Sequence, residues 1–99
     1  MRKFACCLLL SASSLVVSQS DAIANDTYLA QQKSTQQAGQ NRMRHVGGSF
    51  GSGRYEGVGF SSRSADDAIR NACYWGQKSP VGIGVARGAN GWYATVLYR

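Results

Sequence analysis

The fold is decided by the stretch PVGIGVARGANGWYATVLY, which spans residues 80–98. Aliphatic residues alternate with small ones over residues 81–86, and this period of two predicts a β-strand with one aliphatic face. Asn90 and Gly91 follow, a dipeptide that favours a type I′ hairpin turn because both central positions need a positive φ. Residues 92–98 then form a second strand with large side chains on both faces, so we predict that it is the central strand of the sheet.

A further strand and a helix precede this hairpin. Residues 54–60 predict a short strand, and Ser64 is a candidate N-cap with Asp67 three residues later, the spacing of a capping box. Small and apolar residues follow at helical spacing and end before Pro80, which forbids continuation: Ala65, Ala68, Ile69, Ala72 and Cys73. The expected fold is therefore α+β, a β-α-β-β module with a three-stranded sheet and one helix on one face.

The residues before this module have a different composition. Residues 25–53 contain five glutamines and end in the glycine- and serine-rich run of residues 47–53, and few of their side chains are apolar. Because such a segment buries little apolar area against its ordering entropy, the sequence predicts a disordered tether over residues 25–53 and a folded module over residues 54–99.

The first 24 residues have the pattern of a signal peptide. Arg2 and Lys3 precede an uncharged apolar run, and Ala22-Ile23-Ala24 has the small-x-small form of a cleavage site. Cleavage there predicts a secreted or periplasmic protein of residues 25–99. Nine basic and four acidic residues would remain, giving a charge of about +5. The apolar run is too short to span a membrane.

The residue types available for chemistry are few. The mature chain would keep one histidine, His45, and one cysteine, Cys73, with four scattered carboxylates and no metal-ligand spacing, so we expect no enzyme activity, no metal and no cofactor. Cys73 falls on the apolar side of the predicted helix. It could be a core residue, form a disulfide with a second chain or act as a catalytic thiol, and the first of these is preferred.

Glycines suggest a binding face on the sheet. Gly57 and Gly59 alternate with apolar residues in the first strand, as Gly82 and Gly84 do in the second, so we expect all four on one bare face opposite the helix. Such a face could bind a ligand, pack against a second copy or be covered by the tether. The residues expected to border it are aromatic or basic: Arg54, Tyr55, Arg87, Trp92, Tyr93 and Arg99.

These features predict a small exported module that binds or self-assembles at the cell envelope through this face. Self-association is expected because three strands under one short helix bury little apolar area. Two alternatives stay open. One is an inhibitor or effector of a secreted enzyme, which would present the predicted hairpin tip at residues 88–91. The other is a binder of polyanions such as cell-wall polymers or nucleic acid, which the net basic charge would attract.

Overall fold

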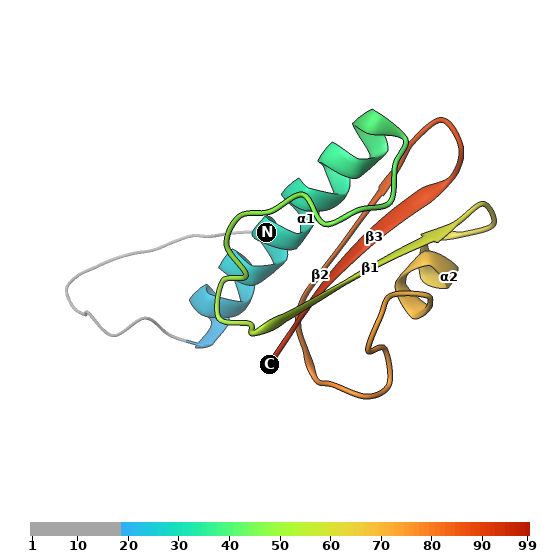
Figure 1. Cartoon of the computed structure of the whole chain (residues 1–99). Helices are drawn as coiled ribbons and strands as arrows, with labels where there is room; N and C mark the ends of the chain where they lie inside the picture. Colours follow the sequence, from blue (N-terminus) through green and yellow to red (C-terminus); the bar gives the residue numbers. More distant parts are fainter. Residues whose placement is uncertain (1–18) are drawn as a thin grey trace.

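The protein is a small α+β fold in which helices cover both faces of one sheet (Figure 1). A computed structural model describes residues 19–99. The elements are α1 (Gln19–Gln40), β1 (Tyr55–Ser61), α2 (Ala65–Arg70), β2 (Pro80–Arg87) and β3 (Trp92–Tyr98). The sheet is antiparallel in the order β1-β3-β2, so the predicted β-α-β-β order and the central position of the last strand are confirmed.

The two glycine runs lie on opposite faces of the sheet, which corrects the expected single bare face. Gly59 and Val85 both pair with Ala94, so the glycines of β1 align with the aliphatic residues of β2. A Cβ on Gly59 would overlap the backbone of α2 at Ala68, whereas one on Gly84 would overlap the backbone of α1 at Ala30. Each glycine run therefore allows one helix to approach the sheet closely, and neither run is open to a ligand.

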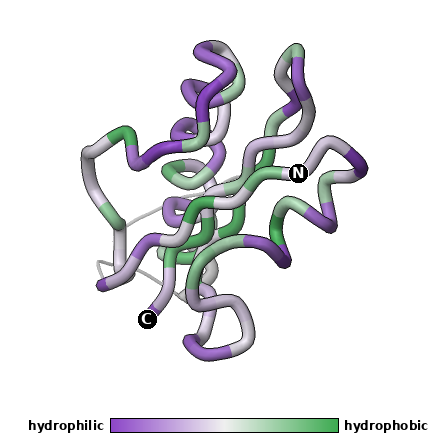
Figure 2. The backbone as a smooth tube through the Cα atoms, turned by 45° about the vertical axis from the view of Figure 1, so that its right-hand side comes forward, coloured by the Kyte–Doolittle hydropathy of each residue, from purple (hydrophilic) through white to green (hydrophobic). Residues whose placement is uncertain are grey.

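Helix α1 replaces most of the predicted tether. Its buried stripe has helical spacing but is largely polar, with Asp26, Ala30, Lys33, Ser34, Gln37 and Ala38 inside. Figure 2 shows the same contrast, with hydrophobic colour concentrated in the strands and hydrophilic colour over the turns of α1. The prediction of disorder over residues 25–53 is wrong for this helix, because each polar side chain of the stripe has a hydrogen-bond partner in the sheet or the following loop, although the side-chain oxygen of Gln37 is left without one.

Contacts between α1 and the rest of the fold include several specific hydrogen bonds. The Ser34 hydroxyl donates to the Gly84 carbonyl and is hydrogen-bonded to the Thr95 hydroxyl, both at 3.0 Å, and the Gln37 side-chain amide donates to the same Thr95 oxygen at 2.7 Å. Asp26 accepts hydrogen bonds from the backbone and the hydroxyl of Ser52. These bonds explain how a glutamine-rich segment forms one layer of the fold.

The opposite face of the sheet carries the hydrophobic cluster. Ala72, Val96 and Tyr98 are buried there, with Ile69, Trp75 and Ile83 packed against them. Ser64 caps α2 as predicted, since its hydroxyl accepts from the Asp67 backbone amide at 3.1 Å. The helix ends at Arg70, so Cys73 lies in the following turn and is exposed rather than buried, which corrects the preferred prediction for this residue.

The hairpin of β2 and β3 is confirmed, but its turn differs from the prediction. The backbone amide of Gly88 donates to the Gly91 carbonyl at 2.8 Å, closing a connection over residues 88–91 in which Asn90 does not adopt a positive φ. The side-chain oxygen of Asn41 accepts from the Ala89 amide at 2.7 Å. The end of α1 therefore holds the hairpin tip, a long-range contact that a local turn rule does not include.

The predicted signal peptide lies mostly outside the described residues. Residues 1–18 are not described, and residues 19–24 form the start of α1. Within residues 19–99, neither helix has the length and the apolar composition that crossing a bilayer requires.

Candidate functional site

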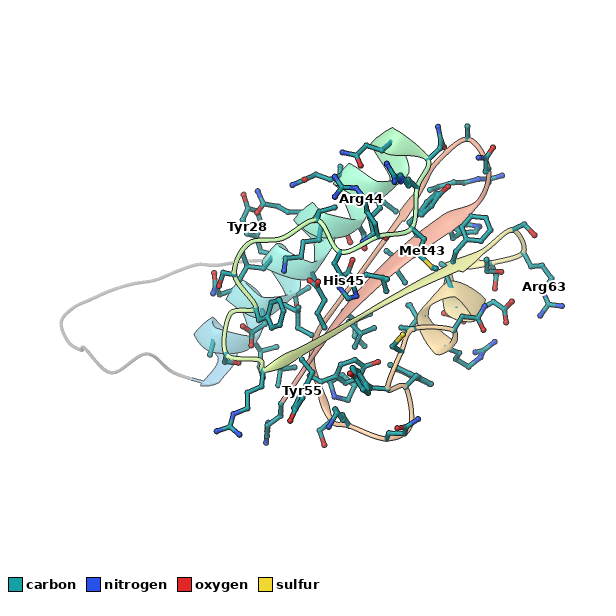
Figure 3. The ribbon with its side chains drawn as sticks, viewed as in Figure 1. Tyr28, Met43, Arg44, His45, Tyr55 and Arg63 are labelled. Atoms are coloured by element: carbon teal, nitrogen blue, oxygen red, sulfur yellow. The ribbon has the colours of Figure 1, made fainter. Side chains whose placement is uncertain are left out.

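A buried ion network links α1, β1 and the loop between them. The Lys33 ammonium lies 2.6 Å from Glu56 Oε2, and His45 Nδ1 lies 2.7 Å from Glu56 Oε1. The side chains of Lys33 and Glu56 are only 5% and 2% exposed, whereas that of His45 is 57% exposed. In Figure 3 His45 lies between α1 and β1, under the loop that carries it. The Lys33 ammonium also lies 4.7 Å from the centre of the Phe50 ring.

The chemistry of this network is limited by its partners. Glu56 holds His45 through Nδ1, as a carboxylate holds the base of a catalytic dyad. Yet no hydroxyl or thiol in residues 19–99 hydrogen-bonds to His45, and Cys73 is beside Gly57 on the other face of the sheet. The network therefore has an orienting carboxylate and a base but lacks an activated nucleophile. Its contacts instead fasten the loop of residues 41–54 to β1.

A second group of residues forms an exposed surface at one end of the sheet. We define the tyrosine–basic patch as Arg54, Tyr55, Tyr74, Lys78 and Arg99. The two tyrosine rings are each 39% exposed and meet edge to face, with centres 5.8 Å apart. The Lys78 ammonium lies 3.8 Å from the centre of the Tyr55 ring and 5.3 Å from that of Tyr74, so two rings hold one cation.

Backbone pairing brings two arginines to the same end of the sheet. The Arg54 amide donates to the Tyr98 carbonyl at 2.7 Å, and the Arg99 amide donates to the Ser79 carbonyl at 2.8 Å. Both arginines are exposed. In Figure 3 Tyr55 lies at the opposite end of β1 from Arg63, so the patch is remote from the start of α2.

The side-chain carboxylates of residues 22–99 lie elsewhere. Asp26 is bonded to Ser52, Glu56 is paired with Lys33, and Asp66 and Asp67 lie in the first turn of α2. The hydrogen bond from the Ser61 hydroxyl, together with the nearby arginine charges, lowers the pKa of Asp67. Among residues 22–99, no side-chain carboxylate forms an ion pair with the three cations of the patch. Their charge is therefore available to an anion.

The rings of the patch rest on a buried third tyrosine. Tyr98 is fully buried, and its ring meets that of Tyr74 edge to face at 5.9 Å. Burial, with a smaller contribution from Cys73, raises the pKa of Tyr98 to about 12. Its hydroxyl has no hydrogen-bond partner among residues 19–99. Tyr74 itself adopts a φ of 68°, which is rare for a bulky residue and is held here by packing between two rings.

The structure separates the six site residues predicted from the sequence. Arg54, Tyr55 and Arg99 lie at the same end of the sheet. Arg87 lies 5.3 Å from the Trp92 ring at the other end of β3, and Tyr93 is 2% exposed against Phe60 on the α1 face. The expectation of a single site from all six is therefore wrong.

Sequence reasoning missed two members of the patch, Tyr74 and Lys78. Both lie in the turns after α2, where the sequence predicts only the end of a helix. The available signal was the density of aromatic and basic residues between Cys73 and Pro80.

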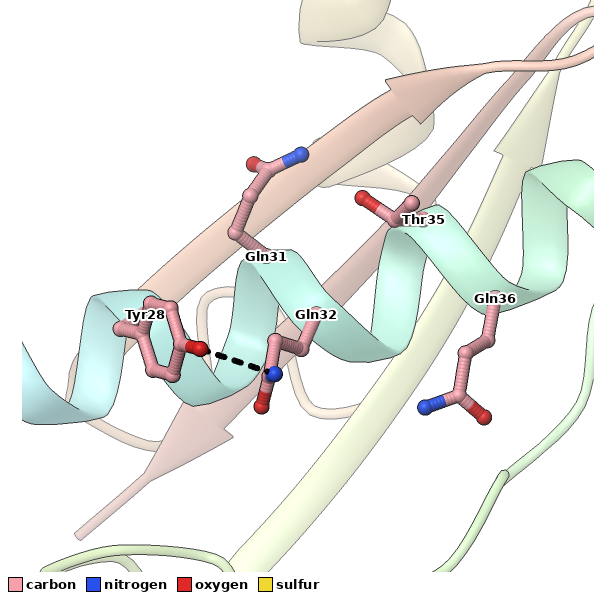
Figure 4. A pocket seen from close by; sticks show the side chains of 5 residues that line it. All are labelled: Tyr28, Gln31, Gln32, Thr35 and Gln36. Atoms are coloured by element: carbon pink, nitrogen blue, oxygen red, sulfur yellow. Dashed lines mark hydrogen bonds between the residues drawn. The ribbon is translucent and has the colours of Figure 1, made fainter.

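The outer face of α1 carries a shallow, open depression (Figure 4). Its lining comes from one helix and is uncharged: Tyr28, Gln31, Gln32, Thr35 and Gln36. The Gln32 side-chain amide donates to the Tyr28 hydroxyl at 3.0 Å. Since it is open and has no charged group, this depression offers less to a ligand than the tyrosine–basic patch. Over residues 19–99, no three potential ligand side chains gather to hold a metal ion.

Comparison of the chain with protein-family models, with curated proteins and with solved structures gives no match.

Proposed function

We propose that this protein is a small exported, non-catalytic module that binds an anionic polysaccharide of the cell envelope through the tyrosine–basic patch. The observation that carries the proposal is the arrangement of Tyr55 and Tyr74, two half-exposed rings that hold the Lys78 ammonium between them. The proposal keeps the basic, aromatic surface predicted from the sequence but moves it from the face of the sheet to one end.

The ligand class follows from the chemistry of the patch. Aromatic rings that are exposed on one side can stack on the apolar face of a sugar ring, because Tyr combines an apolar body with a polar tip. Lys78, Arg54 and Arg99 add three positive charges that have no side-chain carboxylate partner among residues 22–99. Cationic side chains that are not already paired bind carboxylate or phosphate groups through charge-assisted hydrogen bonds. A polymer of acidic sugars combines both features.

The test is a titration with polygalacturonate, a chain of carboxylated sugars, with neutral dextran as the comparison polymer. The variants are Lys78→Gln and Arg54→Gln. Arg87→Gln is the matched control, because Arg87 is also exposed and also lies against an aromatic ring, that of Trp92. It lies at the end of the sheet remote from the patch. We expect each patch variant to weaken binding by about three- to tenfold at low salt, from the loss of about 1 kcal/mol of interaction. The control should bind as the wild type does.

Three results would contradict the proposal, of which the first two concern the patch. The first is absence of binding by the wild-type protein at low salt. The second is an equal loss for Arg54→Gln and Arg87→Gln, which would mean that net charge alone attracts the polymer. The third is binding to dextran with the same affinity, which would remove the argument for an acidic ligand.

A second candidate function rests on the hairpin tip. Residues 88–91 are closed by a backbone hydrogen bond and fixed to α1 through Asn41, so Ala89 and Asn90 form a firmly held exposed loop. Pre-organised loops of this kind reduce the entropy lost on binding, as is useful in an inhibitor of a secreted enzyme. A pull-down from a secreted fraction that recovers an enzyme with the wild type, but not with Asn41→Ala, would favour this alternative.

Export and assembly belong to the same proposal. The leader pattern of residues 1–24 supports a secreted or periplasmic location. Self-association was expected from the sequence because three strands under one short helix bury little area. Helix α1 covers the other face of the sheet, which weakens that reason. A mass measurement of the purified protein with and without reductant would show whether the exposed Cys73 links two chains.

A further inference from the structure

The sheet has two edge strands, β1 and β2, because β3 lies between them. An edge strand presents unpaired N–H and C=O groups, which can pair with a strand from another molecule. In a three-stranded sheet two of the three strands are edge strands, so a large share of the backbone N–H and C=O groups of the sheet points outward. How each edge is covered therefore decides whether the protein can associate through its sheet.

The middle of the β2 edge is closed by a side chain from α1. The Gln31 side-chain amide donates to the Val85 carbonyl at 2.9 Å, and its oxygen accepts from the Val85 amide at 3.1 Å. This pair of bonds is the one that a residue of a neighbouring strand would make with Val85. In Figure 4 Gln31 projects away from Gln32 and Gln36, which belong to the same helix. Gln31 thus occupies the place of a fourth strand.

The register of the sheet agrees with this assignment. Because Val85 directs its backbone groups outward to Gln31, its partner Ala94 pairs by hydrogen bonds with Gly59 on the other side. The next residue of β1, Phe60, must then direct its carbonyl outward. It does so, since the Asn71 side-chain amide donates to that carbonyl at 3.0 Å. Each edge therefore has one amide side chain, with two bonds on β2 and one on β1.

We propose that the β2 edge is a strand-pairing site for a second copy of this chain, and that Gln31 holds it closed. Strand β2 can pair with β2 of a second copy, because residues 80–86 carry no charge and the β-branched residues Ile83 and Val85 favour strand pairing. Antiparallel pairing about a two-fold axis at Gly84 would set Arg87 opposite the partner's Val81, so like charges do not meet. Pro80 at the start of β2 and the irregular register between Pro80 and Gly82 protect that end of the edge.

The experiment compares Gln31→Ala with the wild type by light scattering over about a hundredfold range of concentration. Gln36→Ala is the matched control, since Gln36 is exposed on the same helix and points away from Gln31 in Figure 4. We expect Gln31→Ala to lower the dimer dissociation constant by about tenfold or more, from the two backbone groups it frees. The wild type and the control should remain monomers over the range in which Gln31→Ala dimerises.

A second variant separates edge pairing from other routes to association. Gln31→Ala/Val85→Pro lacks the outward amide at position 85, so we expect it to return to a monomer. Gln31→Glu keeps the acceptor for the Val85 amide but repels its carbonyl, and it should dimerise less than Gln31→Ala; it also serves if Gln31→Ala does not fold. The proposal is overturned if the folded Gln31 variants associate no more than Gln36→Ala, or if Val85→Pro leaves their dimer unchanged.

Discussion

Replacing Lys33 by methionine tests whether the polar stripe of α1 fixes this helix to the sheet. Lys33→Met keeps a long unbranched side chain but removes the ammonium that lies 2.6 Å from Glu56. The Glu56 carboxylate, 2% exposed, would then keep only His45 as a hydrogen-bond partner, and that side chain is largely in solvent. The substitution therefore leaves a buried negative charge that is poorly compensated.

The expected loss of stability is large for a domain of this size. Breaking a buried ion pair from one side costs about 3–5 kcal/mol. Because His45 can still donate to one carboxylate oxygen, we expect a value near the lower limit, about 3 kcal/mol. Small domains have total stabilities of about 5–15 kcal/mol, so this loss is a major part of the total. The double variant Lys33→Met/Glu56→Leu removes both charges and should recover about 2 kcal/mol of the loss.

Urea unfolding, followed by circular dichroism, measures these differences. Lys78→Met is the control, because this lysine contacts tyrosine rings rather than a buried carboxylate, and it should cost less than about 1 kcal/mol. If Lys33→Met unfolds within about 1 kcal/mol of the wild type, the ion pair does not hold α1 on the sheet. The same conclusion would follow if the double variant were less stable than Lys33→Met.

Three further predictions concern packing and pH. Gly84→Ala should destabilise the fold by about 2–4 kcal/mol in urea unfolding, because the added Cβ overlaps the backbone of α1 at Ala30; an unchanged midpoint would mean that α1 does not pack there. Tyr98→Phe removes a buried hydroxyl without a partner in the described chain and should leave stability unchanged or raise it by up to about 1 kcal/mol. The wild type should lose stability as the pH rises from 10 toward 12, because the folded protein keeps the Tyr98 proton to a higher pH than the unfolded chain does. Tyr98→Phe should not show this loss. Asp67→Asn should flatten the loss of stability as the pH falls through 3.8, because the lowered pKa of Asp67 makes the unfolded chain take up the proton first; an unaltered acid profile would contradict this.

The second half of the fold could be predicted from the sequence because its signals are local. The alternation in residues 81–86 and the cap at Ser64 each rest on neighbouring residues, and both are found in the structure. The predicted type I′ turn is not found, and the hairpin tip instead makes a hydrogen bond with a residue far away in the sequence, Asn41. Local rules do not include such a partner.

Helix α1 was missed because the search for periodicity counted only apolar residues. Its buried positions follow one another at helical spacing, but Asp26, Lys33, Ser34 and Gln37 are polar. Each is buried with a hydrogen-bond partner that is distant in the sequence, such as Thr95 for Ser34 and Glu56 for Lys33. A stripe that depends on such partners cannot be told from a solvated helix or a tether before the sheet is known.

The candidate site was partly predicted for a similar reason. Tyr55 begins β1 and Arg54 directly precedes it, so both could be placed from the strand pattern, whereas the phase between β1 and β2 depends on their shared partner Ala94. In the sequence analysis the glycines of both strands were assumed to point to the same side, and all four were therefore placed on one face of the sheet. Tyr74 and Lys78 reach the patch only because α2 stops at Arg70 and the chain turns back over Tyr98.

The most direct test of the account is the location of the bound polymer. A two-dimensional NMR titration of the isotope-labelled protein with a short oligomer of galacturonate would report each backbone amide separately. The account predicts the largest shifts within the tyrosine–basic patch, at Arg54, Tyr55, Tyr74, Lys78 and Arg99, with little change at Arg87 and Trp92. Shifts that are centred on Arg87 and Trp92, or that spread evenly over all basic residues, would contradict it.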